Sequence, residues 1–517
     1  MDASLQVPDD FNATAFIIDK NVSRLKSDKV AIYYQDQKIS YRDLQREINK
    51  VGNGLKRLGI EIENRIAILL HDCPEWVACF FGAIKIGAVP VALNTMMVPQ
   101  DYQYFLKDSR AKAIVVSHNL VQKIESIKDK LDYLKHMIVV GEAGENHFTY
   151  QNLVNGASSE LKAADTCKDD VAFWQYTSGS TGLPKGVMHL HHDLLYLPEY
   201  FLRKTIGVNE SDIFLSVPRL FFNYGLMTMV GVFYNRAAVV LDPEKPMPER
   251  IFEIINKHRP SILSGVPTFY GGMLALANDA HRYTLGSVRE CISGGEPLPL
   301  PIFKEFKERF GLEILEGIGS TESADWYILS RPGRVKPGST GEAVQESEVK
   351  LVDEELREVP RGEIGEALVK SKSTALGYWN KHEMTKKAFI GEWLRTGDLF
   401  CQDEEGYFWF KGRVDETIKT GGIKVIPIEV ERAIEQHPAV AECAVVGAED
   451  EQGLVKPKAF VVLKSGYKPA PELVHAIQKF VKTSMAPYNY PRWIEFIEEL
   501  PRTATGKIQR FKLREFP

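Results

Sequence analysis

The sequence predicts an α/β protein with a large N-terminal domain, whose parallel-rich sheets are covered by helices, and a small α+β domain at the C-terminus. At 517 residues the chain is too long for a single hydrophobic core, so two or more domains are expected. Short apolar runs alternate with helical patterns along most of the chain. Beyond residue 414 about a hundred residues remain, which is enough for an independent domain.

The first helix expected in the N-terminal domain begins after Ser40, which with Asp43 resembles a capping box. Apolar residues then recur at helical spacing over the following turns. A strand at 65–70, a helix near 74–87 and a strand at 88–93 come next. This βαβ order implies parallel strands covered by helices. Further strands are expected from apolar runs at 113–116, 137–140, 237–241 and 261–264.

The segment 410–419 marks the expected change of domain, which places the N-terminal domain at 1–414 and the C-terminal domain at 415–517. The C-terminal domain mixes both kinds of element. We expect strands at 441–446 and 459–463, and helices at 429–436 and 471–484.

Composition and charge exclude several classes of protein. The chain has 44% hydrophobic and 26% charged residues, and its net charge is −5 without a basic block, so nucleic acid is not an expected partner. No apolar run approaches the length that spans a bilayer, and the start lacks the features of a secretory signal. The six cysteines are scattered, which predicts neither a disulfide framework nor a zinc site. A cytoplasmic enzyme, monomeric or homodimeric, fits these bounds.

The strongest local signal is the run 176–186, Tyr-Thr-Ser-Gly-Ser-Thr-Gly-Leu-Pro-Lys-Gly. Glycines let the backbone turn so that several N–H groups converge on one anion, hydroxyls add donors, and Lys185 adds a positive charge. The apolar run 171–174 predicts a buried strand that carries the loop to a sheet edge, which a flexible linker would lack. The pattern therefore predicts a phosphate-binding loop, and its spacing is not that of a Walker loop. The expected phosphate ligands are Thr177, Ser178, Gly179, Ser180, Thr181 and Lys185.

This loop resembles the signature of the adenylate-forming superfamily, and other segments match the superfamily in the same order. The run 317–322 resembles its Tyr-Gly-x-Thr-Glu element, in which Thr321 supplies a hydroxyl and Glu322 a hard oxygen for the Mg²⁺ on a nucleotide. The resemblance makes both residues catalytic and Glu322 the metal ligand. It also assigns Asp398 and Arg413 to the ribose. The nucleotide would further contact Gly294, Gly295, Glu296, Pro297, Gly317, Ile318, Gly319 and Ser320.

The run Leu-Phe-Phe-Asn-Tyr-Gly at 220–225 resembles the acyl pocket of the benzoate-CoA ligase branch, which also shares Ile318. We expect a strand here, with two aromatic rings on one face. Asp325 and Trp326 stand where benzoate-CoA ligases tend to place a histidine near the aryl ring. A carboxylate there would accept a hydrogen bond from a ring hydroxyl and repel a second substrate carboxylate. The expected substrate contacts are Phe222, Asn223, Tyr224, Gly225 and Asp325.

The resemblance also assigns roles in the C-terminal domain. Asp415 matches the hinge about which this mobile domain rotates. Gly421, Gly422 and Lys424 match the stretch that lines the tunnel for the pantetheine of CoA. Lys507 lies in a Pro-x-Thr-x-x-Gly-Lys element, where its charge can reach both a carboxylate and an α-phosphate. Lys507 is the expected catalytic lysine.

Taken over nearly the whole chain, the resemblance implies a ligase that uses ATP, Mg²⁺ and coenzyme A. A carboxylate first attacks the α-phosphorus of ATP, and CoA then attacks the acyl-adenylate, releasing AMP. Two alternatives remain open: a ligase for alicyclic or fatty acids with the same chemistry, and an adenylating protein that loads a carrier. The pocket segment contains no aspartate to hold a substrate amino group, which counts against an amino-acid substrate.

Overall fold

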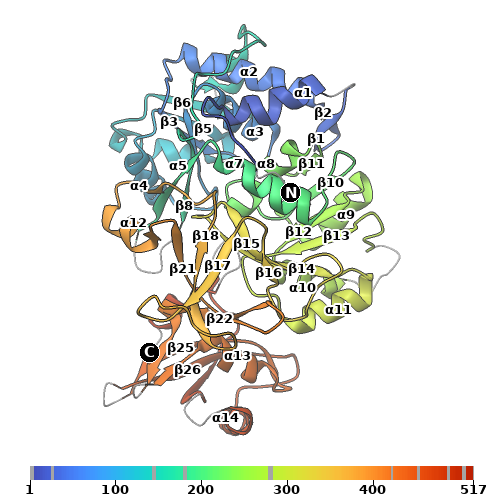
Figure 1. Ribbon diagram of the computed structural model, residues 1–517, viewed down its shortest axis with the longest axis vertical. Helices are drawn as coiled ribbons and strands as arrows, with labels where there is room; N and C mark the ends of the chain where they lie inside the picture. The colour runs from blue at the N-terminus through green and yellow to red at the C-terminus, as the bar shows by residue number, and fades with distance from the viewer. Residues whose placement is uncertain are drawn as a thin grey trace. The chain divides into compact units, whose positions relative to one another are not determined.

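The computed structural model describes residues 5–24, 28–142, 147–177, 183–276, 283–420, 423–450, 454–485, 490–502 and 508–515 (Figure 1). The chain divides into two units. The first unit comprises Met1–Glu348 and Val369–Leu394, and the second comprises Val349–Leu368 and Arg395–Pro517. The predicted domain boundary at 414/415 falls inside the second unit, and it stays a prediction.

The first sheet of the first unit has eight strands in the order β19-β9-β8-β4-β3-β5-β6-β7. Neighbouring strands are parallel from β8 through β7, whereas β9 and β19 are added antiparallel. The predicted βαβ unit is confirmed, with α3 (Pro74–Lys85) between two parallel strands. The strands are β3 (Arg65–Leu69), β4 (Val89–Ala92), β5 (Ala113–Ser117), β6 (His136–Val140), β7 (Phe148–Thr149), β8 (Val171–Thr177), β9 (Lys185–Leu190) and β19 (Gly377–Tyr378).

The second sheet has nine strands in the order β16-β15-β14-β13-β12-β10-β11-β1-β2. Its six central strands are parallel, and antiparallel hairpins close both ends. The strands are β1 (Val30–Tyr34), β2 (Gln37–Ser40), β10 (Ile213–Ser216), β11 (Ala238–Leu241), β12 (Ile262–Gly265), β13 (Glu290–Ser293), β14 (Ile314–Ser320), β15 (Asp325–Leu329) and β16 (Glu342–Ala343).

Helices pack on both faces of each sheet. Strand β3 shows why: Ile66 and Ile68 point into the largest core cluster, and Ala67 and Leu69 point into a second cluster on the other face. A strand buried on both faces reads as a continuous apolar run, which agrees with the parallel pairing that the βαβ order predicted. The helices include α2 (Tyr41–Arg57), α4 (Pro99–Ser109), α7 (Asp193–Tyr196), α8 (Asn223–Tyr234), α9 (Pro248–His258), α10 (Pro267–Leu276), α11 (Leu300–Phe310) and α12 (His382–Ala388).

The predicted start of α2 is confirmed. The Ser40 hydroxyl oxygen accepts a hydrogen bond from the Asp43 N–H at 3.1 Å, which satisfies one of the unpaired donors of the first turn. The buried face of this helix packs against α3. The local sequence pattern therefore defined both the beginning of the helix and its core-facing side.

The second unit is built around small sheets. In the first of these, β17 (Glu348–Val352) pairs with β18 (Ile364–Lys370), then β21 (Trp393–Gln402), which also pairs with β22 (Phe408–Arg413). The four elements predicted for the C-terminal part are confirmed as β25 (Val440–Glu449), β26 (Val455–Leu463), α13 (Pro427–Glu435) and α14 (Pro471–Ser484). Four others were not predicted: β23 (Ile418–Thr420), β24 (Ile423–Val425), β27 (Trp493–Phe496) and α15 (Arg510–Leu513).

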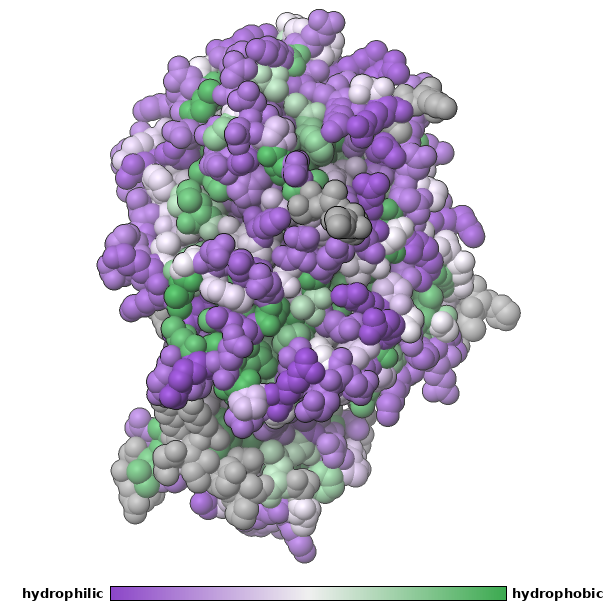
Figure 2. Space-filling view, viewed as in Figure 1, coloured by the Kyte–Doolittle hydropathy of each residue, from purple (hydrophilic) through white to green (hydrophobic). Residues whose placement is uncertain are grey.

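Most of the surface seen in Figure 2 is hydrophilic, with hydrophobic residues in small separate areas. Scattered exposed apolar residues are normal for globular proteins. Among the helices that the structure describes, none combines the length and the apolar character needed to cross a membrane.

Candidate active site

The predicted phosphate loop joins two antiparallel strands at one side of the first sheet. Thr177 ends β8 and pairs with Lys185 at the start of β9, so the sheet holds both ends of the loop. Side chains of α4 brace the same strands: the Tyr104 hydroxyl donates to the Pro184 carbonyl oxygen at 2.7 Å. The predicted ligands Ser178, Gly179, Ser180 and Thr181 lie outside the described residues.

Lys185, Glu322 and Tyr378 meet beside the end of this loop. The Lys185 Nζ atom lies 3.9 Å from Glu322 Oε1 and 4.1 Å from the centroid of the Tyr378 ring. The Tyr378 hydroxyl donates to the same Glu322 oxygen at 2.7 Å. The Lys185 and Glu322 side chains are 14% and 16% exposed, so they are screened from most of the solvent but still reachable by a ligand. The cluster offers an ammonium for a phosphate and a carboxylate for a divalent cation.

The sequence patterns did not predict that Tyr378 belongs to this site. It lies on β19, which reaches β9 only through a pairing of segments far apart in the chain, with Tyr378 opposite Val187. Such a pairing leaves no local pattern in the sequence. The nearby signal was Gly377, whose backbone φ of +143° favours glycine, but a glycine of this kind does not identify its neighbour as a site residue.

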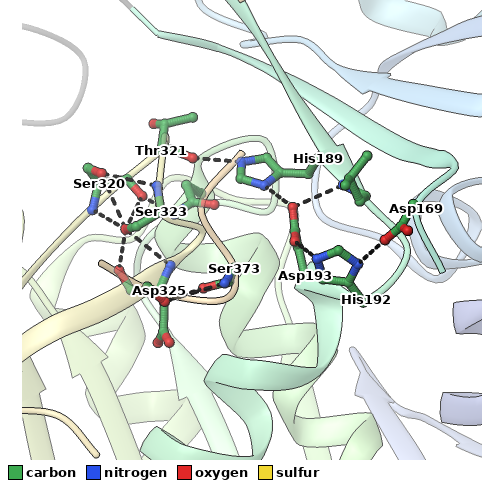
Figure 3. A network of polar contacts seen from close by, with 12 residues as sticks. Asp169, His189, His192, Asp193, Ser320, Thr321, Ser323, Asp325 and Ser373 are labelled. Carbon is green, nitrogen blue, oxygen red and sulfur yellow. Dashed lines mark hydrogen bonds and ion pairs between the residues drawn. The ribbon is translucent and has the colours of Figure 1, made fainter. Parts of the chain in front are cut away.

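Thr321 and Glu322 lie in the turn between β14 and β15. Hydrogen bonds between Ser320 and Ser323 close this turn, and one of them runs from the Ser323 N–H to the Ser320 hydroxyl oxygen at 3.2 Å (Figure 3). The Ala375 N–H donates to the Glu322 carbonyl oxygen at 2.8 Å. The main chain on both sides of the Glu322 side chain is therefore fixed by contacts within the first unit.

The two segments that hold the further predicted nucleotide contacts are adjacent, because β13 and β14 are parallel neighbours. Their glycines also serve the protein's own packing. A Cβ atom at Gly294 or Gly317 would lie 2.3 or 2.2 Å from the Trp326 indole, and one at Gly319 would lie 2.3 Å from the Asp325 carbonyl oxygen. Nucleotide contacts in these segments stay a prediction for Gly294, Gly295, Glu296, Pro297, Gly317, Ile318, Gly319 and Ser320.

The predicted strand around Phe222 and Tyr224 is wrong. Helix α8 begins at Asn223, with Phe222 as its N-cap residue, so the two aromatic rings do not share a strand face. The run is apolar or aromatic apart from Asn223, and periodicity alone cannot separate a buried strand from a buried helix in such a short run. Gly225 is needed where the turn is tight, because a Cβ atom there would lie 2.2 Å from the Arg219 carbonyl oxygen.

Three of the predicted substrate contacts lie near the β14–β15 hairpin. The Tyr224 ring packs edge-on against Trp326 with 4.9 Å between centroids, and its hydroxyl donates to the Ile292 carbonyl oxygen at 3.0 Å. The Asn223 amide nitrogen donates to the Ser320 carbonyl oxygen at 3.2 Å. Across the hairpin, Ser320 pairs with Asp325. Trp326, which the resemblance placed beside Asp325 in this region, is thus in contact with Tyr224.

Asn223 and Asp325 each leave hydrogen-bond capacity unused. The Asn223 Oδ1 atom is buried and has no hydrogen-bond partner among the described residues. Asp325 is 4% exposed, and its carboxyl accepts the Trp326 N–H at 2.7 Å. Burial raises the pKa of Asp325 to about 8, against the smaller opposite effect of that hydrogen bond. Both residues are acceptors that a ligand with a hydrogen-bond donor could satisfy.

In the second unit, the two predicted ribose ligands are brought together by strand pairing. Asp398 on β21 lies opposite Arg413 on β22, and the guanidinium donates to the Asp398 carboxylate at 2.7 Å. Asp398 is buried, and Arg413 also contacts the Thr396 carbonyl oxygen at 3.1 Å. The Asp398 carboxylate is therefore held in a fixed orientation, and ribose binding by this pair stays a prediction.

The predicted hinge, pantetheine tunnel and catalytic lysine also belong to this unit. Asp415 lies in a short 3₁₀ turn, Val414–Glu416, and its role as a hinge stays a prediction. Lys424 lies in β24. Gly421, Gly422 and Lys507 are outside the described residues.

Comparisons with known proteins cover nearly the whole chain. Residues 18–379 match the family described as AMP-binding enzyme, and residues 429–507 match the AMP-binding enzyme C-terminal domain. A benzoate–CoA ligase of Thauera aromatica is 41% identical over 514 residues, covering 99% of this chain and 97% of that protein. A 4-hydroxybenzoate–CoA/benzoate–CoA ligase of Rhodopseudomonas palustris is 39% identical, covering 98% of this chain and 94% of that protein.

Solved structures agree. A crystal structure of an anthranilate CoA ligase in complex with anthranoyl-AMP matches with a TM-score of 0.92 and 40% identity, covering 98% of both chains. A benzoate CoA ligase from Burkholderia xenovorans matches with a TM-score of 0.88 and 37% identity, covering 98% of this chain and 100% of that one. Enzymes of this kind use ATP and CoA as substrates, with Mg²⁺ as the usual metal. The chain belongs to the AMP-binding family of adenylate-forming enzymes, in its benzoate-CoA ligase branch, and is an AMP-forming acid–CoA ligase.

Proposed function

We propose that this protein joins an aromatic carboxylate, benzoate or a substituted benzoate, to coenzyme A in a reaction that depends on ATP and Mg²⁺. The observation that carries the proposal is the meeting of Lys185, Glu322 and Tyr378 at the end of the phosphate loop. This cluster supplies both charges that a nucleotide with its metal requires. The relatives at about 40% identity, which act on benzoate, 4-hydroxybenzoate and anthranilate, support an aromatic acid.

In the first half-reaction the substrate carboxylate attacks the α-phosphorus of ATP, forming the aryl-adenylate and releasing pyrophosphate. The chain's part is positioning and charge stabilisation, since no covalent enzyme intermediate is needed. Lys185 and the loop after Thr177 hold the phosphates, and Lys507 reaches the reacting carboxylate and α-phosphate. Glu322 fits a Mg²⁺ ligand, because one carboxylate together with phosphate oxygens is the set this ion commonly takes. The bound ion neutralises phosphate charge.

In the second half-reaction the CoA thiolate attacks the carbonyl carbon of the aryl-adenylate, and AMP leaves. Asp398 and Arg413 hold the ribose in this scheme, and Gly421, Gly422 and Lys424 line the path of the pantetheine. The two steps need different groups near the same acyl carbon. Rotation of the domain 415–517 about Asp415 would exchange them, so that Lys507 serves only the first step.

We also propose that the preferred acid carries a hydrogen-bond donor on its ring, as an amino or hydroxyl group. Asn223 Oδ1 lacks a donor, and Asp325 lies buried with a raised pKa. An amino or hydroxyl group on the ring would donate a hydrogen bond to one of these two side chains, whereas unsubstituted benzoate has no group that could do so. A second carboxylate on the ring would be repelled by Asp325 when it is ionised.

The test is a substrate panel. AMP formation would be measured with ATP, Mg²⁺ and CoA for benzoate, 2-aminobenzoate, the three hydroxybenzoates, cyclohexane carboxylate and short fatty acids. We expect aromatic acids to exceed the others, and an amino- or hydroxybenzoate to exceed benzoate in kcat/KM. In Asn223→Ala and Asp325→Leu the preference for the substituted ring over benzoate should narrow. A preference for non-aromatic acids would contradict the proposal, and an unchanged preference in both variants would remove the assigned role of these residues.

A further inference from the structure

A fully buried histidine connects the strand of the phosphate loop to the segment that carries Glu322. His189 lies on β9, and its ring stacks on Phe173 with 4.9 Å between centroids and 15° between planes. Its Nδ1 atom lies 2.9 Å from Asp193 Oδ2, and its Nε2 atom lies 2.7 Å from the Thr321 carbonyl oxygen (Figure 3). Neither His189 nor Asp193 has measurable exposure to solvent.

The hydrogen-bond partners show that the Nε2 atom of this ring carries a proton. A carbonyl oxygen only accepts, so Nε2 must carry the proton that it shares with Thr321. Asp193 Oδ2 also accepts the Leu190 N–H at 2.9 Å. Burial alone would raise the pKa of Asp193, but hydrogen bonds from His189 and His192 outweigh it and hold this pKa below its usual value. Asp193 is therefore a carboxylate, and it faces the Nδ1 side of the His189 ring.

The network continues to the surface. The His192 Nε2 atom lies 3.1 Å from Asp193 Oδ1, and its Nδ1 atom lies 3.2 Å from Asp169 Oδ1, whose side chain is 61% exposed (Figure 3). Two histidines thus face the one buried carboxylate, and a second carboxylate at the surface faces the outer histidine. The His189 ring therefore has the buried Asp193 carboxylate on one side and the Thr321 carbonyl oxygen on the other.

Two side chains of strand β9 contact the same short segment of the β14–β15 turn. Lys185 and His189 lie four residues apart on β9, and even spacing along a strand places side chains on the same face. Lys185 contacts the carboxylate of Glu322, whereas His189 contacts the main-chain oxygen of the residue just before it. One strand therefore holds both the charged end of Glu322 and the backbone from which that side chain projects.

We propose that His189, held by Asp193, is a positioning residue for adenylation, which fixes the Thr321–Glu322 peptide so that Glu322 meets the metal and phosphates of ATP. The inference rests on the proposed role of Glu322. A displacement of this peptide by about 1 Å would suffice to lower the rate strongly, since small errors in the placement of catalytic groups cost about 100-fold. His189 touches no reacting atom itself.

The test compares substitutions that keep one donor at a time. His189→Gln can still donate to the Thr321 carbonyl oxygen, whereas His189→Asn can donate to Asp193 but falls short of Thr321. His191→Asn is the matched control, because His191 is also buried on this segment but accepts the Ala13 N–H at 3.0 Å. If His189→Asn does not fold, Asp193→Asn is tested in its stead, because that substitution removes the carboxylate charge that holds the His189 ring.

Three quantities are measured: acid-dependent exchange of pyrophosphate into ATP, thioester formation from supplied aryl-adenylate, and the Mg²⁺ concentration at which a non-hydrolysable ATP analogue stabilises the protein against heat. In His189→Asn we expect kcat for exchange to fall about 10- to 100-fold, with the thioester step unchanged and more Mg²⁺ required. His189→Gln should recover most of the loss, and His191→Asn should show none of it.

Two results would overturn the inference: equal losses of both half-reactions in His189→Asn, or no recovery in His189→Gln together with matching losses in His191→Asn. Either would reduce His189 to a structural role. If the wild-type protein adenylated none of the acids in the panel, the proposed substrate class would fail instead. The Mg²⁺ requirement with the ATP analogue would then still test His189, because that measurement needs no acid.

Discussion

The hydroxyl of Tyr378 gives the sharpest single test of the candidate active site. Tyr378→Phe removes the hydrogen bond to Glu322 but keeps the ring over which Lys185 lies. A hydrogen bond to a charged group contributes about 1.5–3 kcal/mol, which corresponds to a factor of about 10 to 150 in rate if the loss falls on the transition state. We therefore expect kcat/KM for Mg·ATP in the exchange of pyrophosphate into ATP to fall by that factor.

The same variant should form thioester from supplied aryl-adenylate at the wild-type rate, since the role proposed for Glu322 concerns only the metal and phosphates of ATP. Tyr378→Leu, which also removes the ring beneath the Lys185 ammonium, should lose more than Tyr378→Phe. Circular dichroism and the unfolding temperature would verify that both variants fold. Unchanged exchange in Tyr378→Phe would refute the idea that this hydroxyl orients Glu322, and a parallel loss in the thioester step would show a general effect on the fold.

Three further predictions concern other parts of the chain. Lys507→Ala should abolish pyrophosphate exchange while sparing thioester formation from supplied adenylate; equal loss of both would contradict its role in the first step only. Because burial raises the pKa of Asp325 to about 8, the stability it contributes is fully present below its unfolded pKa of about 3.9 and is lost as pH rises through about 8. Thermal unfolding across this range should show the wild type losing stability relative to Asp325→Asn, and parallel curves would refute the shift. Arg510→Met should destabilise the second unit by about 3–5 kcal/mol, because it leaves the buried Glu431 carboxylate without the guanidinium that contacts it at 2.9 Å. Denaturant unfolding would measure this loss of stability, and a loss below about 1 kcal/mol would contradict the prediction.

Local patterns in the sequence predicted the elements that depend on local physics. The cap at Ser40, the βαβ unit around α3, and the C-terminal elements β25, β26, α13 and α14 are confirmed, because capping, periodicity and apolar runs act over a few residues. Lys185 and Glu322 were predicted for one site and do lie together. The resemblance to a known family identified these two residues, since spacing alone cannot show that distant segments meet.

What the sequence did not predict depends on contacts between distant segments. Tyr378 reaches Glu322 only through the pairing of β19 with β9, and His189 reaches Thr321 only through the packing of β9 beside the β14–β15 turn. The segment at Asn223 was wrongly assigned to a strand, because a short run that is apolar or aromatic on both sides of one polar residue fits either kind of buried element. In each case the missing information was which partner the segment packs against.

The indole of Trp326 occupies the space in which side chains at both Gly294 and Gly317 would otherwise lie. These three positions therefore cannot change independently. Along any lineage of related enzymes, an alanine at either glycine position would be tolerated only after the ring at 326 had been replaced by something smaller, and a chain that had gained such an alanine could not return to tryptophan in one step. The order in which substitutions occur, rather than the choice of residue at one position, is thus constrained by a single ring. Across an alignment of relatives, glycine at these two positions should accompany a large aromatic residue at the third.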